Sequence, residues 1–142
     1  MSWRRTEATP VTAESRVRRG AADRVRTKRV TEPAARHEGT RVRVMRLWPR
    51  GVRKTAADQW LKGLGTPLDP IRGWKTGTIS WEALATAYRQ HLRPAEARAD
   101  FARLRALARR GRVRLLCTCP DEAHCHRGIL RRQVLAALRR SR

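Results

Sequence analysis

The sequence lacks the features that mark membrane and secreted proteins. It contains no run of about eighteen apolar residues, so no transmembrane segment is expected. The basic N-terminus is not followed by the apolar stretch of a secretory signal. Only 3 cysteines occur in 142 residues, and their close spacing does not suit a disulfide framework. We therefore expect one domain of ordinary size in a reducing compartment, the cytoplasm.

Acidic residues and lysine are also scarce. The chain has 12 acidic residues against 34 basic ones, which gives a formal net charge of +22, and only four of the basic residues are lysine. A field this positive attracts nucleic acid and other polyanions, at least non-specifically. A GC-rich genome produces the same arginine-rich composition, with the arginines on solvated helix faces. The charge therefore leaves nucleic-acid binding open.

The N-terminal segment is poor in large apolar side chains. Beyond Met1, residues 1–27 contain only Trp3, Val11, Val17 and Val25, and basic residues exceed acidic ones. Such a segment does not bury a core. We predict a basic, flexible tail over residues 1–27 and a folded domain over residues 28–142.

Apolar patterning predicts strands that alternate with helices. Residues 40–47 alternate as a strand does, and Thr55 is a candidate N-cap for a short helix through Leu61. A loop over 63–70 and helices from Ser80 and over 94–110 follow. Residues 113–117 predict a short buried strand, and residues 126–139 a final helix. This order predicts an α/β fold, a single compact domain whose largely parallel sheet is flanked by helices.

From residue 28 onward the chain resembles the YeaO-like family, catalogued as domain of unknown function 488. The resemblance is carried by KRV at 28–30, Pro33, Gly39, RVRVMRLWPRGVRK at 41–54, Trp60-Leu61, Arg72-Gly73-Trp74, Tyr88 and Leu92. The pattern CxC followed by HCHR at 124–127 is similar to the cysteine-bearing branch. The family implies an α/β fold and supplies no established reaction.

Two positions depart from the family pattern. Met45 stands where members often have aspartate, directly before RLWPRG. The histidine that follows the Arg-x-Trp segment in the family is replaced here by Lys75-Thr76-Gly77. Whether Met45 abolishes an activity of the family is left open by the sequence.

The ends of the predicted strands suggest a site for an anion. Ligands of open parallel sheets bind at the carboxyl ends of the strands, where RLWPRG and CTCP both emerge. The start of the last helix also favours an anion there. We therefore predict that Arg46, Trp48, Arg50 and Arg127 bind a phosphate-bearing or other anionic ligand. In the alternative interpretation, Trp48 forms a turn and the arginines face solvent.

Cysteine and histidine cluster between positions 117 and 126, and three chemistries fit them. Cys125 can act as a nucleophile with His126 as its catalytic partner, because a helix start and nearby cations favour a thiolate. The segment from His124 to Arg131 also matches the HCxxGxxR outline of tyrosine phosphatases, although Arg132 replaces the usual hydroxyl residue.

The second chemistry is a zinc or iron site, for which Cys119, His124 and Cys125 are the proposed ligands, with Cys117 and His126 beside them. Their spacing is not that of a standard zinc finger. In the third interpretation the cysteines only pack, and Cys117, at a strand end, is the best example.

The favoured function is a small intracellular enzyme, or enzyme-derived domain, with an anion-binding Cys/His/Arg pocket. The alternative is a non-catalytic nucleic-acid-binding protein that uses its arginine-rich surface. No membrane partner is expected. The sequence does not decide whether the chain is an enzyme, and it leaves the substrate, the reaction, any cofactor and the oligomeric state open.

Overall fold

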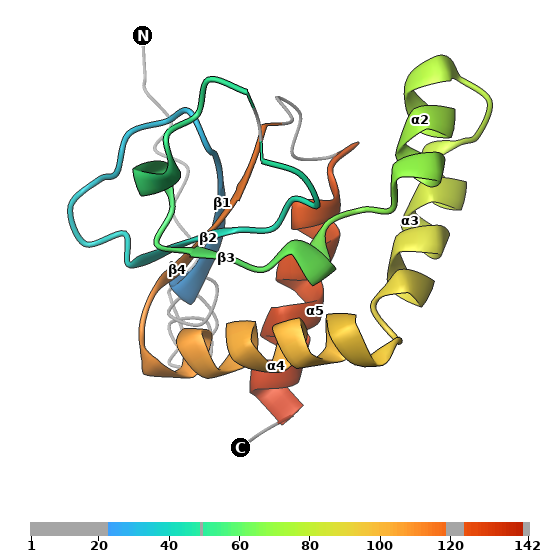
Figure 1. The fold of residues 1–142 in the computed structure, drawn as a ribbon. Coiled ribbons are helices and arrows are strands. Elements are labelled where there is room, and N and C mark those ends of the chain that lie inside the picture. The colour runs from blue at the N-terminus through green and yellow to red at the C-terminus, as the bar shows by residue number, and fades with distance from the viewer. Residues whose placement is uncertain (1–22, 49, 119–123, 141–142) are drawn as a thin grey trace, which may run out of the picture.

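A four-stranded parallel sheet forms the centre of the protein (Figure 1). The computed structural model describes residues 23–48, 50–118 and 124–140. The strands lie in the order β1 (Val25–Arg29), β4 (Val113–Cys117), β2 (Thr40–Arg43) and β3 (Gln59–Trp60), and all neighbours run parallel. The predicted α/β fold with a parallel sheet is confirmed.

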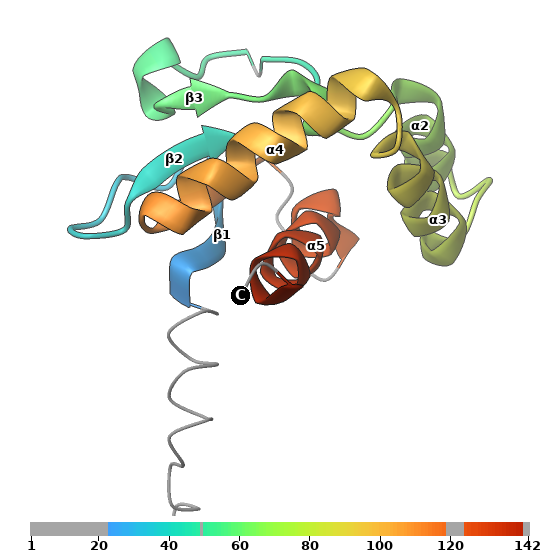
Figure 2. The same ribbon diagram turned by 90° about the horizontal axis from the view of Figure 1, so that it is seen from below.

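Two long helices cover one face of this sheet. They are α4 (Ala95–Arg110), which runs in front of the strands in Figure 2, and α5 (His126–Arg140), which lies beside them. The shorter α2 (Leu68–Thr76) and α3 (Trp81–His91) pack on each other to one side, and 3-10 turns lie at Lys54–Ala56 and Lys62–Leu64. No helix in the described part of the chain is long and apolar enough to cross a membrane.

Strand alternation divides the buried residues between the two faces of the sheet. Val42, Val113 and Leu115 point toward the helices and share a core with Leu104 of α4 and Leu130 of α5. All five are fully buried. Burying a side chain of this size stabilises the fold by about 1.5–3 kcal/mol. These contacts hold the start of α5 against the carboxyl ends of β2 and β4.

Several predicted elements are confirmed. Ser80 caps α3, because its Oγ accepts a hydrogen bond from the Ala83 N–H at 3.1 Å. The helix predicted over 94–110 is α4, which ends before Gly111. The predicted strand 113–117 is β4, and the predicted last helix is α5.

The N-terminal boundary lies earlier than predicted. Strand β1 begins at Val25, so residues 25–27 belong to the sheet and not to a flexible tail. Val25 is fully buried in the core. The apolar content of the segment alone did not reveal this, because the strand is completed by its pairing with β4. Residues 1–22 of the predicted tail lie outside the described residues.

The short helix predicted from Thr55 through Leu61 is wrong. The chain there forms a 3-10 turn and then strand β3, because the Asp58 N–H donates to the Arg41 carbonyl at 2.8 Å. The strand predicted over 40–47 ends at Arg43. The loop predicted over 63–70 contains one 3-10 turn and the start of α2, a helix that was not predicted.

A buried ion-pair network fixes the loop between β1 and β2. Glu38 is 6% exposed and accepts hydrogen bonds from Lys28 Nζ and Arg41 Nη1, each at 2.7 Å. Arg41 also donates to the carbonyls of Ala56 and Glu32, at 2.8 and 2.7 Å. The network therefore ties β1, β2 and the segment before β3 together on the face opposite the helices.

Replacing Glu38 with glutamine is expected to destabilise the protein in a pH-dependent way. Burial opposes ionisation of Glu38, but the hydrogen bonds from Lys28 and Arg41 lower its pKa from 4.5 to about 2. A depressed carboxyl pKa stabilises the fold above the unfolded-state value, and this stability is lost as the pH falls through the folded-state value. The loss in Glu38→Gln at neutral pH is about 3 kcal/mol.

Urea unfolding at several pH values measures this difference. The gap between wild type and Glu38→Gln should shrink as the pH falls from 4.5 toward 2. Glu32→Gln, in the exposed part of the same loop, is the matched control and should change little. A gap that stays constant over this pH range would contradict the role assigned to Glu38.

Candidate functional site

The site lies where two strands end and the last helix begins. Strand β4 ends at Cys117, β2 is followed by Val44, and Cys125 directly precedes α5. The Cys125 carbonyl accepts a hydrogen bond from the Gly128 N–H at 3.1 Å, which places Cys125 at the first turn of the helix. This is the edge of a parallel sheet at which ligands commonly bind.

Cys125 and His126 form a hydrogen-bonded pair at this edge. Cys125 Sγ lies 3.7 Å from His126 Nδ1, and His126 Nε2 contacts the Val44 carbonyl oxygen. A carbonyl only accepts hydrogen bonds, so Nε2 carries the ring proton and Nδ1 directs its lone pair at the sulfur. The ring is thus held in the tautomer that accepts a proton from the thiol.

Tyr88 holds the imidazole from the side. Its ring meets the His126 ring edge-on, with the ring centroids 5.3 Å apart. Tyr88 is fully buried, and its hydroxyl donates to the Leu64 carbonyl at 2.7 Å. Burial raises the pKa of Tyr88 well above its usual value, so the phenol stays neutral. Tyr88 therefore limits rotation of His126 and keeps water from this side of the ring.

Cys117 joins the pair from the end of β4. The possible ligand atoms of Cys117, Cys125 and His126 all lie within 4.8 Å of one another. All three residues are buried, with exposed fractions of 5%, 4% and 7%. Cys117 is buried as the sequence predicts for a packing residue, but it also contributes to the wall of a cavity.

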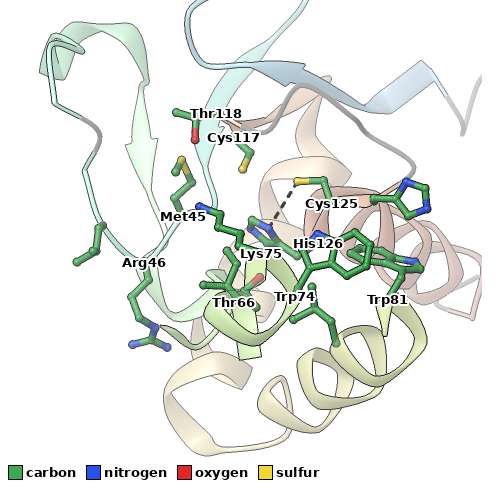
Figure 3. A pocket seen from close by; sticks show the side chains of 14 residues that line it. Met45, Arg46, Thr66, Trp74, Lys75, Trp81, Cys117, Thr118, Cys125 and His126 are labelled. Atoms are coloured by element: carbon green, nitrogen blue, oxygen red, sulfur yellow. Dashed lines mark hydrogen bonds between the residues drawn. The ribbon is translucent and has the colours of Figure 1, made fainter. Parts of the chain in front are cut away.

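A cavity of about 410 Å³ opens over these three residues (Figure 3). Most of its wall is apolar and comes from α2, α3 and the segment after β2. The apolar side chains are those of Met45, Leu47, Ile71, Trp74, Trp81 and Leu84. Met45 contributes an apolar side chain to this wall, so the cavity has no carboxylate at this position.

Three aromatic rings form one part of the wall. The rings of Trp74 and His124 stack with their centroids 5.8 Å apart, and Trp81 meets His124 edge-on at 5.4 Å. The Trp74 and Trp81 rings also meet edge-on, at 5.7 Å. His124, a predicted metal ligand, thus lies in the aromatic wall, while the predicted ligand Cys119 lies outside the described residues.

Among the described residues, two cationic side chains line the cavity, Arg46 and Lys75. Arg46 Nη2 lies 2.9 Å from His91 Nε2, and Figure 3 shows its guanidinium turned away from Cys125. Burial and the charge of Arg46 lower the pKa of His91, and Nε2 of this ring also lies 3.2 Å from the Gly63 carbonyl oxygen. Lys75 is exposed, and its side chain extends into the cavity from α2.

The other predicted anion ligands do not line the cavity. Arg127 is 3% exposed and donates to the Cys117 carbonyl at 3.3 Å, which ties α5 to the end of β4. Trp48 Nε1 donates to the Val52 carbonyl at 2.6 Å, and Arg50 is exposed. Of the four predicted anion ligands, only Arg46 contributes to the cavity wall.

Arg43 explains where Trp48 lies. This arginine is fully buried, and its guanidinium carbon lies 3.9 Å from the centroid of the Trp48 ring and 5.2 Å from that of Trp60. Burial lowers the pKa of Arg43 to about 10. Cation–π attraction offsets part of the desolvation of the guanidinium. Trp48 is thus held in a second cluster with Arg43 and Trp60.

Sequence reasoning missed four contributors to the site. They are the Val44 carbonyl, Lys75 and the cavity-facing rings of Trp74 and Trp81. The Arg72-Gly73-Trp74 pattern marked one of them as part of the family resemblance. No periodic pattern in the sequence indicated that α2 and α3 pack near the strand ends. Their position depends on tertiary packing alone.

Comparisons with known proteins identify the family of this chain. A family model described as the active DUF488-N3 subclade (DUF488-N3a) matches residues 25–138. The uncharacterized protein YeaO of Escherichia coli (strain K12) is 46% identical over 50 residues, which is 34% of this chain and 43% of YeaO. That match therefore spans less than half of the relative, and no solved structure matches the chain. Because the family model covers most of the chain, the protein belongs to the DUF488 family, within its N3a subclade.

Proposed function

We propose that the protein is a thiol-dependent enzyme in which Cys125 is the nucleophile and His126 is the general base. The observation that carries this proposal is the contact of Cys125 Sγ with His126 Nδ1, with Nε2 held by the Val44 carbonyl. A nucleophile, a base and a group that orients the base are the three parts of an activated nucleophile.

The proposed chemistry begins with transfer of the Cys125 proton to His126 Nδ1. The resulting thiolate lies at the start of α5, where the helix dipole favours negative charge. The thiolate forms a bond to the electrophilic atom of the substrate while the bond to the leaving group breaks. The leaving group takes the proton from Nδ1, and water later releases the covalent intermediate with His126 as the base.

The cavity favours an anionic ligand with a flat apolar part. Trp74 and Trp81 offer aromatic surface, and Lys75 supplies a positive charge at the same opening. A phosphate-bearing substrate fits this combination. The tyrosine-phosphatase outline is not supported, because residues 126–131 are part of helix α5 and Arg131 donates to the Val25 carbonyl.

Nucleic acid is the alternative partner that the charge favours. The net charge is +22, and α4 carries exposed arginines at positions 98, 103, 109 and 110. Non-catalytic binding through such a surface depends strongly on salt and does not involve Cys125. The thiol proposal, in contrast, depends on one side chain in the cavity.

Alkylation of the metal-free protein by iodoacetamide tests the thiol proposal. Mass spectrometry resolves the rate at each cysteine as a function of pH. We expect Cys125 to react fastest below about pH 7, where an ordinary thiol with a pKa of about 8.5 is almost entirely protonated. Added phosphate should slow the reaction, and Cys125→Ser should remove the fast phase. Equal, slow rates at every cysteine would refute the proposal.

A further inference from the structure

We propose that Cys117, Cys125 and His126 also form a binding site for a single Zn²⁺ ion, which silences the Cys125 thiol when it binds. This site differs from the zinc or iron site that the sequence suggested, because it uses the end of β4 and excludes His124, which lies in the aromatic wall. The ion and the reactive thiolate are two alternative states of one cluster.

The spacing of the donor atoms suits one tetrahedral ion. All possible ligand atoms of the three residues lie within 4.8 Å of one another, and Cys125 Sγ is 3.7 Å from His126 Nδ1. Zinc–sulfur and zinc–nitrogen bonds of about 2.3 and 2.0–2.1 Å place two tetrahedral ligands about 3.6 Å apart. The Cys125–His126 pair therefore has the separation that a shared ion requires, and Cys117 lies within 4.8 Å of both.

The donor types select the metal. Two thiolates and an imidazole are ligands that zinc prefers, whereas Ca²⁺ and Mg²⁺ prefer oxygen ligands. All three residues are buried, and they lie at the end of β4 and at the start of α5. The two thiolate charges balance the charge of the ion, so the bound cluster adds no net charge to the buried site.

The surroundings of His126 already match those of a metal ligand. A ligating histidine usually donates its second ring N–H to a carbonyl or carboxylate, which fixes the ring and its tautomer. His126 makes this contact through Nε2 to the Val44 carbonyl, so Nδ1 is the nitrogen available to the ion. The Tyr88 ring, packed edge-on, holds the same orientation.

Among the described residues, three protein ligands are grouped here, and the cavity lies beside them. A water molecule or an anion would complete the coordination there. With zinc bound, Cys125 Sγ and His126 Nδ1 both donate to the ion, so neither proton transfer nor nucleophilic attack takes place. Zinc is therefore expected to act as a reversible inhibitor of the proposed thiol chemistry.

Titration of the reduced, metal-free full chain with Zn²⁺ against a chromophoric chelator tests this site. We expect one zinc ion per chain, and the affinity should fall more than about 100-fold in Cys117→Ser, Cys125→Ser and His126→Asn, because each variant loses a direct ligand. His37→Asn is the matched control and should bind zinc as the wild type does. His37 is exposed, and its backbone φ of 63° suits asparagine.

Alkylation of the wild type keeps the test independent of variant folding. Bound zinc should protect Cys117 and Cys125 from iodoacetamide, and EDTA should restore the reactivity of Cys125. The absence of stoichiometric binding would overturn the inference, as would binding that does not change in Cys117→Ser. Neither result affects the reactivity of Cys125 in EDTA, on which the proposed enzyme function rests, so the two proposals can fail separately.

Discussion

The His126→Asn variant is expected to alkylate at Cys125 about 30-fold more slowly than the wild type at pH 7, because an ordinary thiol with a pKa of about 8.5 is only slightly ionised there. His126 Nδ1 lies 3.7 Å from the sulfur and, in the tautomer fixed by Val44, is the base that removes the thiol proton. Asparagine has no titratable group, so the variant thiol must ionise by itself.

The shape of the pH profile separates loss of the base from a general structural effect. The wild-type rate at Cys125 should change little from slightly acidic to neutral pH. The His126→Asn rate should rise about tenfold per pH unit up to the ordinary thiol pKa of about 8.5. His37→Asn should keep the wild-type profile. A His126→Asn profile parallel to that of the wild type would show that His126 does not activate Cys125.

Deletion of residues 1–27 is expected to prevent stable folding, whereas deletion of residues 1–22 is expected to preserve it. The longer deletion removes Val25, which is fully buried, and the positions of β1 that pair with Val113, Arg114 and Leu115. It also removes the Val25 carbonyl that accepts a hydrogen bond from Arg131. Val25 alone accounts for about 1.5–3 kcal/mol, and the edge of β4 becomes exposed.

The shorter deletion is the matched control, because it leaves β1 complete. Thermal unfolding followed by circular dichroism compares the two truncated chains with the full chain. The chain without residues 1–22 should keep a midpoint close to that of the full chain, since that segment has few large apolar residues. Similar midpoints for both deletions would show that β1 contributes little to stability.

Locally encoded elements of the fold were predictable from sequence. Helix α4 begins after Pro94 and ends before Gly111, and the Ser80 side chain caps α3, so each carries its own boundary signals. Strand β3 carries none. It forms because Asp58 meets Arg41 across the sheet, a contact between residues well separated in sequence that outweighs the helix propensity of the segment after Thr55.

In the site, too, some residues are indicated by the local sequence, whereas the position of others depends on tertiary packing. Cys125 and His126 are adjacent at a helix start, so the sequence pointed to them directly. Arg127 and Trp48 looked like anion ligands, but Arg127 Nη1 and Trp48 Nε1 donate to backbone carbonyls. The aromatic wall of Trp74 and Trp81 depends on how α2 and α3 pack, which no local pattern specifies.

The ultraviolet absorbance of thiolate, recorded for metal-free wild type and Cys125→Ser as a function of pH, tests the central claim most directly. If the His126 pair activates Cys125, the difference between the two proteins will show one thiolate below about pH 7, well below the ordinary thiol value of about 8.5. If the difference appears only near that ordinary value, Cys125 is not activated and the proposed nucleophile is contradicted.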